Sequence, residues 1–210
     1  MRKKNNKISN TKGFTLVETL IGLMILTMAI VAATSLLISV IQSNKQIVKT
    51  LQAHYLAQEG LEAVRNVRDT NWMNNRVNWK EGFGDEDIPD FGRPNVYVIG
   101  LKQGAFRSSE DPWLIALSEE GSEADKVYLC GEVEGNQYFS NECGNDGVLT
   151  EFTRHIEISK PEYCSGAEIE QDLENLCNDG KVIFVKSVVE FGETEVSLEE
   201  ILTDWKGGAL

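Results

Sequence analysis

The chain has 210 residues and a formal net charge of -13 at pH 7. This length accommodates one domain of ordinary size together with a membrane anchor. Residues 1–13 carry five Lys and Arg and no acidic residue, so the rest of the chain has a net charge of -18. Such an acidic body argues against nucleic acid as a direct partner, because phosphate binding needs a positive surface.

The first predicted element is a long apolar helix directly after the basic stub. Residues 14–41 contain one ionisable residue, Glu18. At 1.5 Å per residue they form a helix of about 42 Å, and the hydrocarbon core of a bilayer is about 30 Å thick. We expect the basic stub to stay on the cytoplasmic side of the membrane, which places the chain after Lys45 outside.

Three ordinary kinds of N-terminal segment fit this pattern incompletely. A secretory signal has a shorter apolar core and a small-residue cleavage site, and no A-x-A pattern follows this one. A lipoprotein signal needs a Cys at the end of the core, whereas the first Cys here is Cys130. A signal anchor fits the length but leaves Glu18 unexplained, because a carboxylate in hydrocarbon needs a partner and this segment contains no cation.

The run Gly13-Phe14-Thr15-Leu16-Val17-Glu18 resembles the processing site of type IV pilins and of the pseudopilins of type II secretion and competence systems. The resemblance implies that residues 1–13 are a class III leader, which prepilin peptidase removes between Gly13 and Phe14, and that Phe14 is then N-methylated. It also implies that Glu18 pairs with the terminal ammonium of a neighbouring subunit. Two charges that are costly apart in lipid would become a pair on assembly.

The helix is expected to continue beyond the membrane, so that it occupies residues 14–68. The segment from Gln42 to Asn66 has no Pro, and its first Gly is Gly60. Apolar residues recur there at steps of three and four, which predicts a stripe that packs on a soluble domain. The stripe consists of Ala53, Ala57, Leu61, Val64 and Val67.

Residues 69–94 are predicted to form the loop between the helix and the domain that follows, because Gly, Pro and acidic residues interrupt the helical pattern. Asp85, Glu86 and Asp87 in this loop are a candidate calcium site. They lack the Gly and the distal Glu of the familiar calcium-binding loop, so a solvated acidic turn is the favoured interpretation.

Residues 95–210 are predicted to form a β-rich head domain. Five runs rich in β-branched and aromatic residues are separated by turn residues: Val96–Leu101, Trp113–Leu117, Lys126–Leu129, Phe152–Ile158 and Lys181–Phe191. The fourth run alternates apolar and polar residues and predicts a half-buried antiparallel strand, whereas Val182–Val189 is apolar on both faces and predicts the central strand. The tail from Glu195 to Lys206 fits a final strand or a short helix.

The predicted fold is therefore α+β, with a long N-terminal helix, half of it transmembrane, packed on an antiparallel sheet. This is the pilin architecture. Two further stretches resemble minor pilins of the V type and related pseudopilins: Ala57–Asn66 with Asp69, Asn71 and Trp72, and Val185–Phe191 followed by Leu198–Trp205. Major pilins commonly carry Pro at the position of Ser35, so the resemblance favours a minor subunit.

Four Cys lie beyond the membrane segment, where an oxidising exterior favours disulfides. The spacing C-x12-C occurs twice, and each second Cys leads into Asn-Asp-Gly, a tight-turn signal. We therefore predict the local bridges Cys130–Cys143 and Cys164–Cys177, each contributing about 3 kcal/mol. The spacing leaves the other two connectivities open.

Neither a metal site nor a catalytic site is predicted. The chain has no C-x-x-C, and its two His, His54 and His155, are better interpreted as structural or surface residues. It also lacks a Gly-x-Ser-x-Gly elbow and a phosphate-binding Gly loop. The sequence thus predicts a non-enzymatic chain without a cofactor.

The expected function is that of a minor structural subunit of a type IV pilus, which contributes to assembly, priming or adhesion. Its expected location is the bacterial inner membrane, with the C-terminus outside, and then the pilus. The expected partners are other pilin subunits, prepilin peptidase, the inner-membrane assembly platform and, before assembly, membrane lipid. The alternatives are a minor pseudopilin of type II secretion or DNA uptake, a permanently anchored adhesin or receptor, and a membrane-tethered hydrolase that uses His155.

Overall fold

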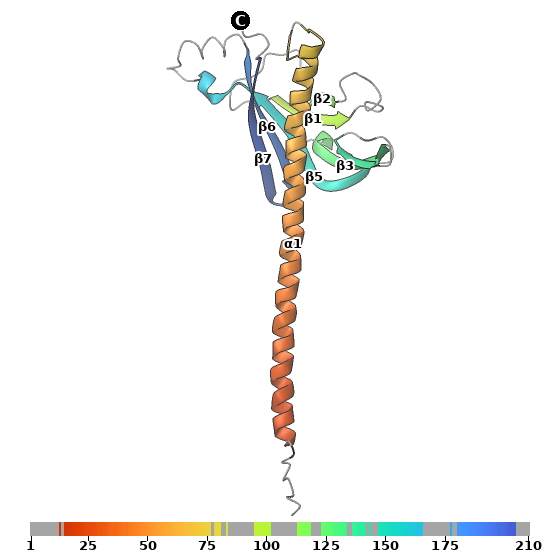
Figure 1. The fold of residues 1–210 in the computed structure, drawn as a ribbon, viewed down its shortest axis with the longest axis vertical. Coiled ribbons are helices and arrows are strands. Elements are labelled where there is room, and N and C mark those ends of the chain that lie inside the picture. Colours follow the sequence, from red (N-terminus) through yellow and green to blue (C-terminus); the bar gives the residue numbers. More distant parts are fainter. Residues whose placement is uncertain are drawn as a thin grey trace, which may run out of the picture. The chain divides into compact units, whose positions relative to one another are not determined.

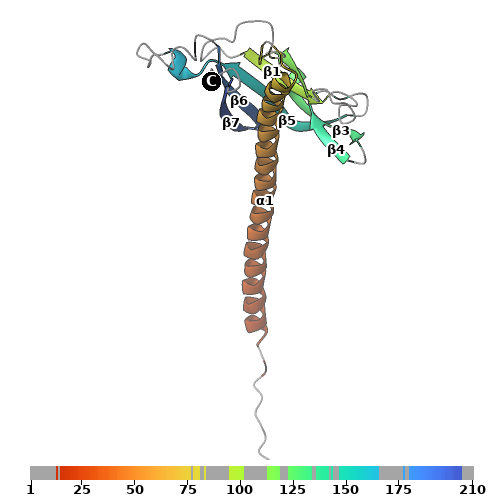
Figure 2. The same cartoon turned by 45° about the horizontal axis from the view of Figure 1, so that its top comes forward.

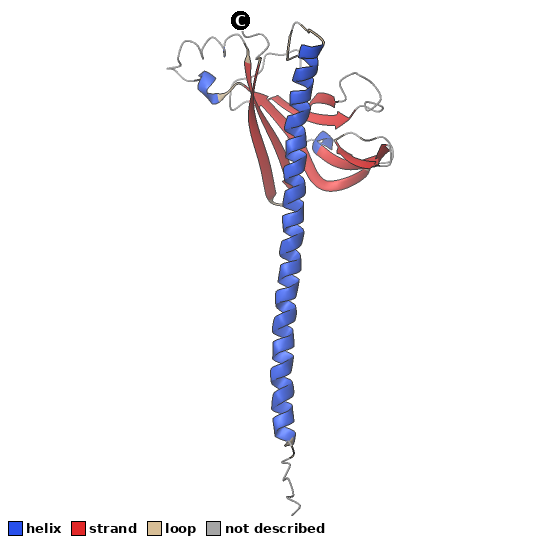
Figure 3. Cartoon of the chain, in the orientation of Figure 1, coloured by secondary structure: helices blue, strands red, loops and turns tan. Residues whose placement is uncertain are grey.

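The computed structural model describes residues 13, 15–76, 78–80, 83, 95–101, 113–118, 123–133, 136–141, 143, 147–165, 177 and 180–204. These residues form one long helix, α1 (Leu16–Met73), and an antiparallel sheet of seven strands (Figure 1). Two disulfides tie the region after the helix. This arrangement confirms the predicted α+β, pilin-like fold class (Figure 3).

The chain divides into two compact units, residues 1–48 and 49–210. In the first unit, α1 exposes apolar side chains all along its length, from Leu16 (76% exposed) to Ile41 (47% exposed). Within the part of the chain that the structure describes, α1 is the one helix that is long and apolar enough to cross a membrane, judged by length and composition.

In the second unit, one side of α1 packs on the sheet. Four of the five residues of the predicted stripe are buried, and Leu61 is half-buried. Helix α1 continues to Met73, five residues beyond the predicted end at residue 68. The extension is anchored, since Asn71 and Trp72 are buried and Trp72 Nε1 donates a hydrogen bond to Asp204 Oδ1 at 3.0 Å.

The seven strands pair around β5, the longest of them. Along one edge, β5 pairs with β3 through its first half and with β1 through its last residues, and along the other edge it pairs with β6. The outer strands complete the sheet, since β2 pairs with β1, β4 with β3, and β7 with β6. The strands are β1 (Asn95–Leu101), β2 (Trp113–Ser118), β3 (Lys126–Val133), β4 (Asn136–Ser140), β5 (Val148–Ser159), β6 (Val182–Phe191) and β7 (Thr194–Thr203).

The sheet differs from the sequence-based expectation in three respects. Strand β4 was not predicted, and β5 begins four residues earlier than expected. The second half of β5 is buried on both faces, since His155 is 4% exposed and Ser159 3% exposed, whereas Val148 and Leu149 at its start are exposed. Strand β6, which contains the predicted central strand, lies between β5 and β7 and is therefore an interior strand. However, β5 pairs with β1, β3 and β6 and so connects the two parts of the sheet. Alternation of apolar and polar residues, which predicted one exposed face, therefore understated the burial of β5.

The tail forms a strand from Glu195 to Thr203, which resolves the choice that the sequence left open for this part; residues 205 and 206 lie outside the described residues. Strand β7 pairs with β6 in unbroken antiparallel register from Val182↔Thr203 to Phe191↔Thr194. Gly192, in the hairpin turn, has φ of +59°, a conformation that Gly adopts without the strain of a Cβ. Because each residue of β7 pairs with β6, a helix is excluded there.

The core between α1 and the sheet consists of two clusters of buried side chains. Strands β6 and β7 lie on one side of α1, and β3 and β4 on the other (Figure 2). One cluster includes Ala53, Leu56, Phe152, Val189 and Phe191. The other includes Val64, Val67, Trp72, Tyr97, Ile99, Ile156 and Ile158. Core packing therefore accounts for the stripe on the second half of α1.

The two disulfides are Cys130–Cys143 and Cys164–Cys177, the pairs expected from the spacing. The first joins β3 to the segment after β4. The second joins a short 3-10 helix, η3 (Glu162–Ser165), to the residue that precedes the turn into β6. No free Cys remains, so the other two connectivities are excluded.

Candidate functional site

The candidate site lies at the start of α1, where Thr15 caps the helix. The backbone amide of Glu18 donates a hydrogen bond to Thr15 Oγ1 at 3.3 Å, and the amide of Thr19 donates to the Thr15 carbonyl at 3.2 Å. Thr-x-x-Glu is the spacing of a capping box, whose Thr satisfies a helix amide that lacks a backbone partner. Thr15 therefore fixes where α1 begins and places Glu18 in its first turn.

Sequence reasoning did not single out Thr15, although the capping-box spacing to Glu18 was a usable signal. Gly13 lies two residues before the cap, among the described residues. Phe14 and the basic residues of the leader lie outside the described residues. The roles expected for Gly13, Phe14 and Glu18 in cleavage, methylation and docking therefore remain predictions.

Glu18 is surrounded on α1 by exposed apolar side chains. Leu16, Val17 and Ile21 are 76%, 63% and 54% exposed. The first turn of a helix favours a carboxylate, because the helix dipole is positive there. The next cation along α1 is Lys45, which is 27 residues away and so about 40 Å along the helix axis. Nothing else on the apolar half of α1 carries a charge that could compensate Glu18.

Four hydroxyl groups on the apolar half donate hydrogen bonds to carbonyls of the helix itself. Thr27 Oγ1 donates a hydrogen bond to the Met24 carbonyl at 2.8 Å, and Thr34 Oγ1 donates to the Val31 carbonyl at 2.9 Å. Thr19 and Ser35 bond in the same way. Such bonds reduce the cost of a hydroxyl in hydrocarbon, where an unpaired polar group is unfavourable. The charged carboxylate of Glu18 cannot form such a bond, because it has no proton to donate to a carbonyl of its own helix.

The helix runs without a break through Ser35, where the sequence departs from major pilins. Ser35 Oγ donates to the Val31 carbonyl at 2.9 Å, and the residue is an interior position of α1 along the sequence, far from either end of the helix. A Pro at this place would remove a backbone hydrogen bond and bend the helix. The apolar half of this chain is therefore regular where a Pro-containing helix is kinked.

Side chains of the second unit fix α1 to the sheet by charge as well as by packing. Arg65 NH2 lies 2.6 Å from Glu200 Oε2 on β7, and Arg65 NH1 pairs with Glu62 one turn earlier. The hydrogen bond that Arg65 donates to Glu200 raises the pKa of Arg65 above its ordinary value, although partial burial opposes the shift. A second ion pair joins the sheet to α1, because NH1 of the buried Arg154 on β5 lies 2.7 Å from Glu59 Oε2 on α1.

The two His do not form a hydrolytic centre among the described residues. His54 is exposed on α1. His155 is buried in β5 on the sheet, where its Nε2 lies 3.5 Å from Glu157 Oε1 without a hydrogen bond. Within the described ranges, no group of three His, Cys, Asp or Glu is arranged to hold a metal ion. The calcium candidates Asp85, Glu86 and Asp87 lie outside those ranges.

Residues 8–34 match the prokaryotic N-terminal methylation motif. The match supports a type IV pilin-like family. It spans Gly13, Phe14 and Glu18 and ends inside the apolar half of α1. Comparison with curated proteins and with solved structures finds no match.

This pilin-like motif belongs to structural proteins rather than enzymes, and it implies processing by prepilin peptidase and assembly with other pilins. The leader together with the exposed apolar helix indicates a membrane-anchored subunit. The motif, the cap at Thr15 and the isolated charge of Glu18 therefore coincide at one end of α1.

Proposed function

We propose that this chain is a minor, non-enzymatic structural subunit of a type IV pilus, made as a prepilin in the bacterial inner membrane. The observation that carries the proposal is the isolated charge of Glu18. It lies within the matched methylation motif, in the first turn of a helix whose surrounding side chains are apolar and exposed.

The proposed docking step follows from the chemistry of that charge. Cleavage after Gly13 releases the basic leader and leaves a new ammonium group on Phe14, which is then methylated. The ammonium of a neighbouring subunit pairs with the Glu18 carboxylate, so that two charges that are unfavourable alone in an apolar environment neutralise each other. The Thr15 cap supports this step because it holds Glu18 in the first turn.

The second unit is proposed to be the head that the filament displays. A basic stub before α1 and Lys45 after the apolar run favour an orientation with the head outside the cytoplasm. The two disulfides support this side of the membrane, because disulfides persist in oxidising compartments. The head would act in assembly, priming or adhesion, with the inner-membrane assembly platform as a partner.

Two features support a minor subunit of the V type. Ser35 stands where major pilins commonly carry Pro. The two stretches that resemble V-type minor pilins also contact each other, since Gly60 packs against Ser187, Arg65 pairs with Glu200 and Trp72 bonds to Asp204. The residues that carry the resemblance thus lie together where α1 packs on the β6–β7 hairpin.

A minor pseudopilin of type II secretion or DNA uptake is the alternative, because pseudopilins share the processing motif. Neighbouring genes would separate these systems. A permanently anchored adhesin or receptor is the alternative from another class, since its helix would have the same apolar surface.

Mass spectrometry of the mature N-terminus tests the proposal. The chain purified from membranes of cells that contain prepilin peptidase should begin at methylated Phe14. The same chain from cells without the peptidase should keep residues 1–13 and serves as the control. A chain that begins at Met1 in both preparations would contradict the pilin proposal and support the permanent anchor.

A further inference from the structure

Asn141, directly after β4, bonds to three parts of the sheet at once. Its Nδ2 donates hydrogen bonds to the carbonyls of Asp125 and Arg154, both at 2.9 Å. Its backbone amide donates to the Ile99 carbonyl on β1 at 3.1 Å. Asn141 is 8% exposed, so these groups have little access to water. The side chain and backbone amide of this one residue together join β5, the entry to β3 and β1.

Asn141 also positions the charge that links the sheet to α1. Arg154, whose side chain is fully buried, donates from Nε to Asn141 Oδ1 at 3.1 Å. Its NH1 donates to Glu59 Oε2 on α1 at 2.7 Å, and its NH2 to the Ile99 carbonyl at 3.5 Å. Burial lowers the pKa of Arg154, and the Glu59 carboxylate opposes that shift. The orientation of the guanidinium therefore depends on Asn141 and Glu59, and its charge is compensated by the Glu59 carboxylate.

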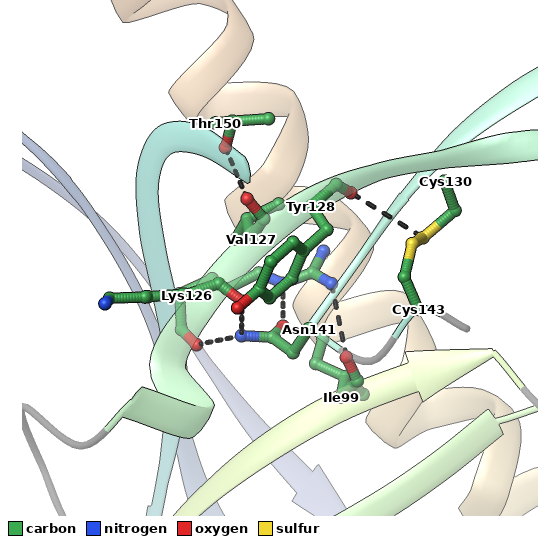
Figure 4. The surroundings of a disulfide bond; sticks show 9 residues. Ile99, Lys126, Val127, Tyr128, Cys130, Asn141, Cys143 and Thr150 are labelled. Carbon is green, nitrogen blue, oxygen red and sulfur yellow. Dashed lines mark hydrogen bonds between the residues drawn. A yellow bond between two sulfur atoms is a disulfide. The ribbon is translucent and has the colours of Figure 1, made fainter. Parts of the chain in front are cut away.

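The Cys130–Cys143 disulfide lies two residues beyond Asn141. The last strand pair before Asn141 joins Ser140 to Tyr128, and Cys143 is then fixed to Cys130 on β3. Asn141 is thus held between a strand pair and a covalent bridge, and Figure 4 shows it in the surroundings of that bridge together with Ile99. The entry to β5 packs tightly here, since a Cβ on Gly147 would lie 2.6 Å from Cys143 Cβ.

We propose that the Cys130–Cys143 disulfide is an oxidation-dependent lock on the contact between α1 and β5. With the bridge closed, Asn141 is held where its Oδ1 accepts from Arg154 and aims the guanidinium at Glu59. With two free thiols, the segment after β4 loosens and the Arg154–Glu59 pair opens, while both core clusters stay packed. This inference concerns the coupling of head and helix and does not depend on the role in a pilus.

Closing the lock is a two-electron oxidation. The two thiols lose two protons and two electrons as the S–S bond forms, and a disulfide-bearing oxidant accepts them by thiol–disulfide exchange and leaves as a dithiol. Such oxidants act outside the cytoplasm, where disulfides persist. A chain that has not yet met the oxidant would hold its head on α1 more loosely than the oxidised chain does.

The second disulfide provides a matched control within the same chain. Cys164–Cys177 has the same sequence separation of 13 as Cys130–Cys143. In the chain-entropy model both bridges constrain the unfolded chain equally, because this effect depends on loop length. The hydrogen bonds of Asn141 and Arg154 given above involve neither Cys164 nor Cys177. If removing Cys130–Cys143 loosens the contact between α1 and β5 more than removing Cys164–Cys177 does, the difference measures the local effect of the first bridge.

Hydrogen exchange of the full chain in detergent, with carboxyl footprinting of Glu59, tests the lock. We expect amides of residues 56–63 to exchange about tenfold faster in Cys130→Ser/Cys143→Ser than in the parent, and Glu59 to become reactive to carbodiimide. Cys164→Ser/Cys177→Ser should leave both readouts within about twofold of the parent. Asn141→Ala, with both bridges intact, should reproduce the loss of the first bridge.

Several results would overturn the proposal. Equal effects of the two bridge deletions would show a generic loss of stability, and unchanged exchange at residues 56–63 would show that the bridge does not hold the contact. Global unfolding of Cys130→Ser/Cys143→Ser would show that the bridge holds the whole fold rather than one contact. In a Glu59→Gln background, where the ion pair is already absent, a further acceleration on removing the bridge would likewise contradict the mechanism.

Discussion

Gly60 on α1 lies directly against Ser187 on β6, so closely that a Cβ on Gly60 would stand 2.3 Å from Ser187 Oγ and 3.2 Å from Ser187 Cβ. The Ser187 hydroxyl is buried and makes no hydrogen bond. A Gly inside a helix is unfavourable by about 1 kcal/mol relative to Ala, so the close approach has a local cost in helix stability. The absence of a side chain at residue 60 lets α1 approach the centre of the sheet.

Gly60→Ala should therefore lower the free energy of unfolding by about 1–3 kcal/mol, because the overlap outweighs the gain in helix propensity. Denaturant unfolding of the full chain in detergent, followed by circular dichroism, measures the change. Ser187→Ala alone should be neutral or stabilising, because it removes an unpaired buried hydroxyl. The loss in Gly60→Ala/Ser187→Ala should be smaller than the sum of the two single changes, and a loss equal to that sum would argue against a direct contact.

Removing the charge of Glu59 should be much more damaging than removing that of an exposed partner. Glu59→Gln leaves the buried guanidinium of Arg154 without its counterion, and we expect a loss of about 3 kcal/mol in the free energy of unfolding. Glu151 provides the matched control, since it pairs with Lys49 at 2.6 Å with side chains 49% and 38% exposed. Glu151→Gln should change stability by less than about 1 kcal/mol. Similar losses in both variants would contradict this ranking.

Glu18→Ala should separate processing from assembly. Because Gly13 and Phe14 are unchanged, we expect the leader to be removed as in the parent, whereas incorporation into filaments should fall at least about tenfold for lack of the charge pair. Immunoblots of membrane and sheared-filament fractions measure the two steps. Ser35→Ala, which alters the apolar half of α1 without touching a charge, is the control. Normal incorporation of Glu18→Ala would exclude the pairing role.

Thr15→Ala should fray the start of α1, because the hydroxyl that accepts the Glu18 amide is lost. We expect about 1 kcal/mol of local destabilisation and faster exchange of the amides of Glu18 and Thr19. Thr15→Ser keeps the hydroxyl and should behave like the parent. Exchange in detergent, read by mass spectrometry after proteolysis, distinguishes the two variants. Equal protection in both would show that the cap does not hold the first turn.

Local patterns in the sequence were sufficient for the main elements of the fold. The absence of Pro and the apolar repeat predicted α1, and the spacing of the Cys predicted both bridges. Strand β4 (Asn136–Ser140) was missed because it has only five residues, of which Tyr138 and Phe139 alone are aromatic, and it is held as a strand by pairing with β3. Similarly, the last turn of α1 depends on contacts far away in the sequence, such as the bond from Trp72 to Asp204.

The candidate site was partly accessible from sequence. The motif around Glu18 is local and could be read directly, and so could the Thr15 cap, had the capping-box spacing been considered. Arg154 could not be foreseen as a buried residue. Its place in β5 puts the Arg154 side chain on the face toward α1. The negative charge that compensates its guanidinium comes from Glu59, which lies 95 residues earlier, and a further hydrogen-bond acceptor comes from Asn141. Burial of a charge is decided by such distant partners rather than by strand alternation.

The internally bonded hydroxyls on the apolar half of α1 have a consequence for extraction from the bilayer. Thr19, Thr27, Thr34 and Ser35 each donate to a carbonyl of the same helix. When this surface moves from lipid to an equally apolar protein surface, none of these bonds has to break. The barrier to transfer then arises mainly from the two ends of the segment, where charge meets water. Transfer out of lipid would thus leave the polarity around residues 19–35 unchanged, and its energetic cost would fall at the charged groups near the two ends, Glu18 and Lys45.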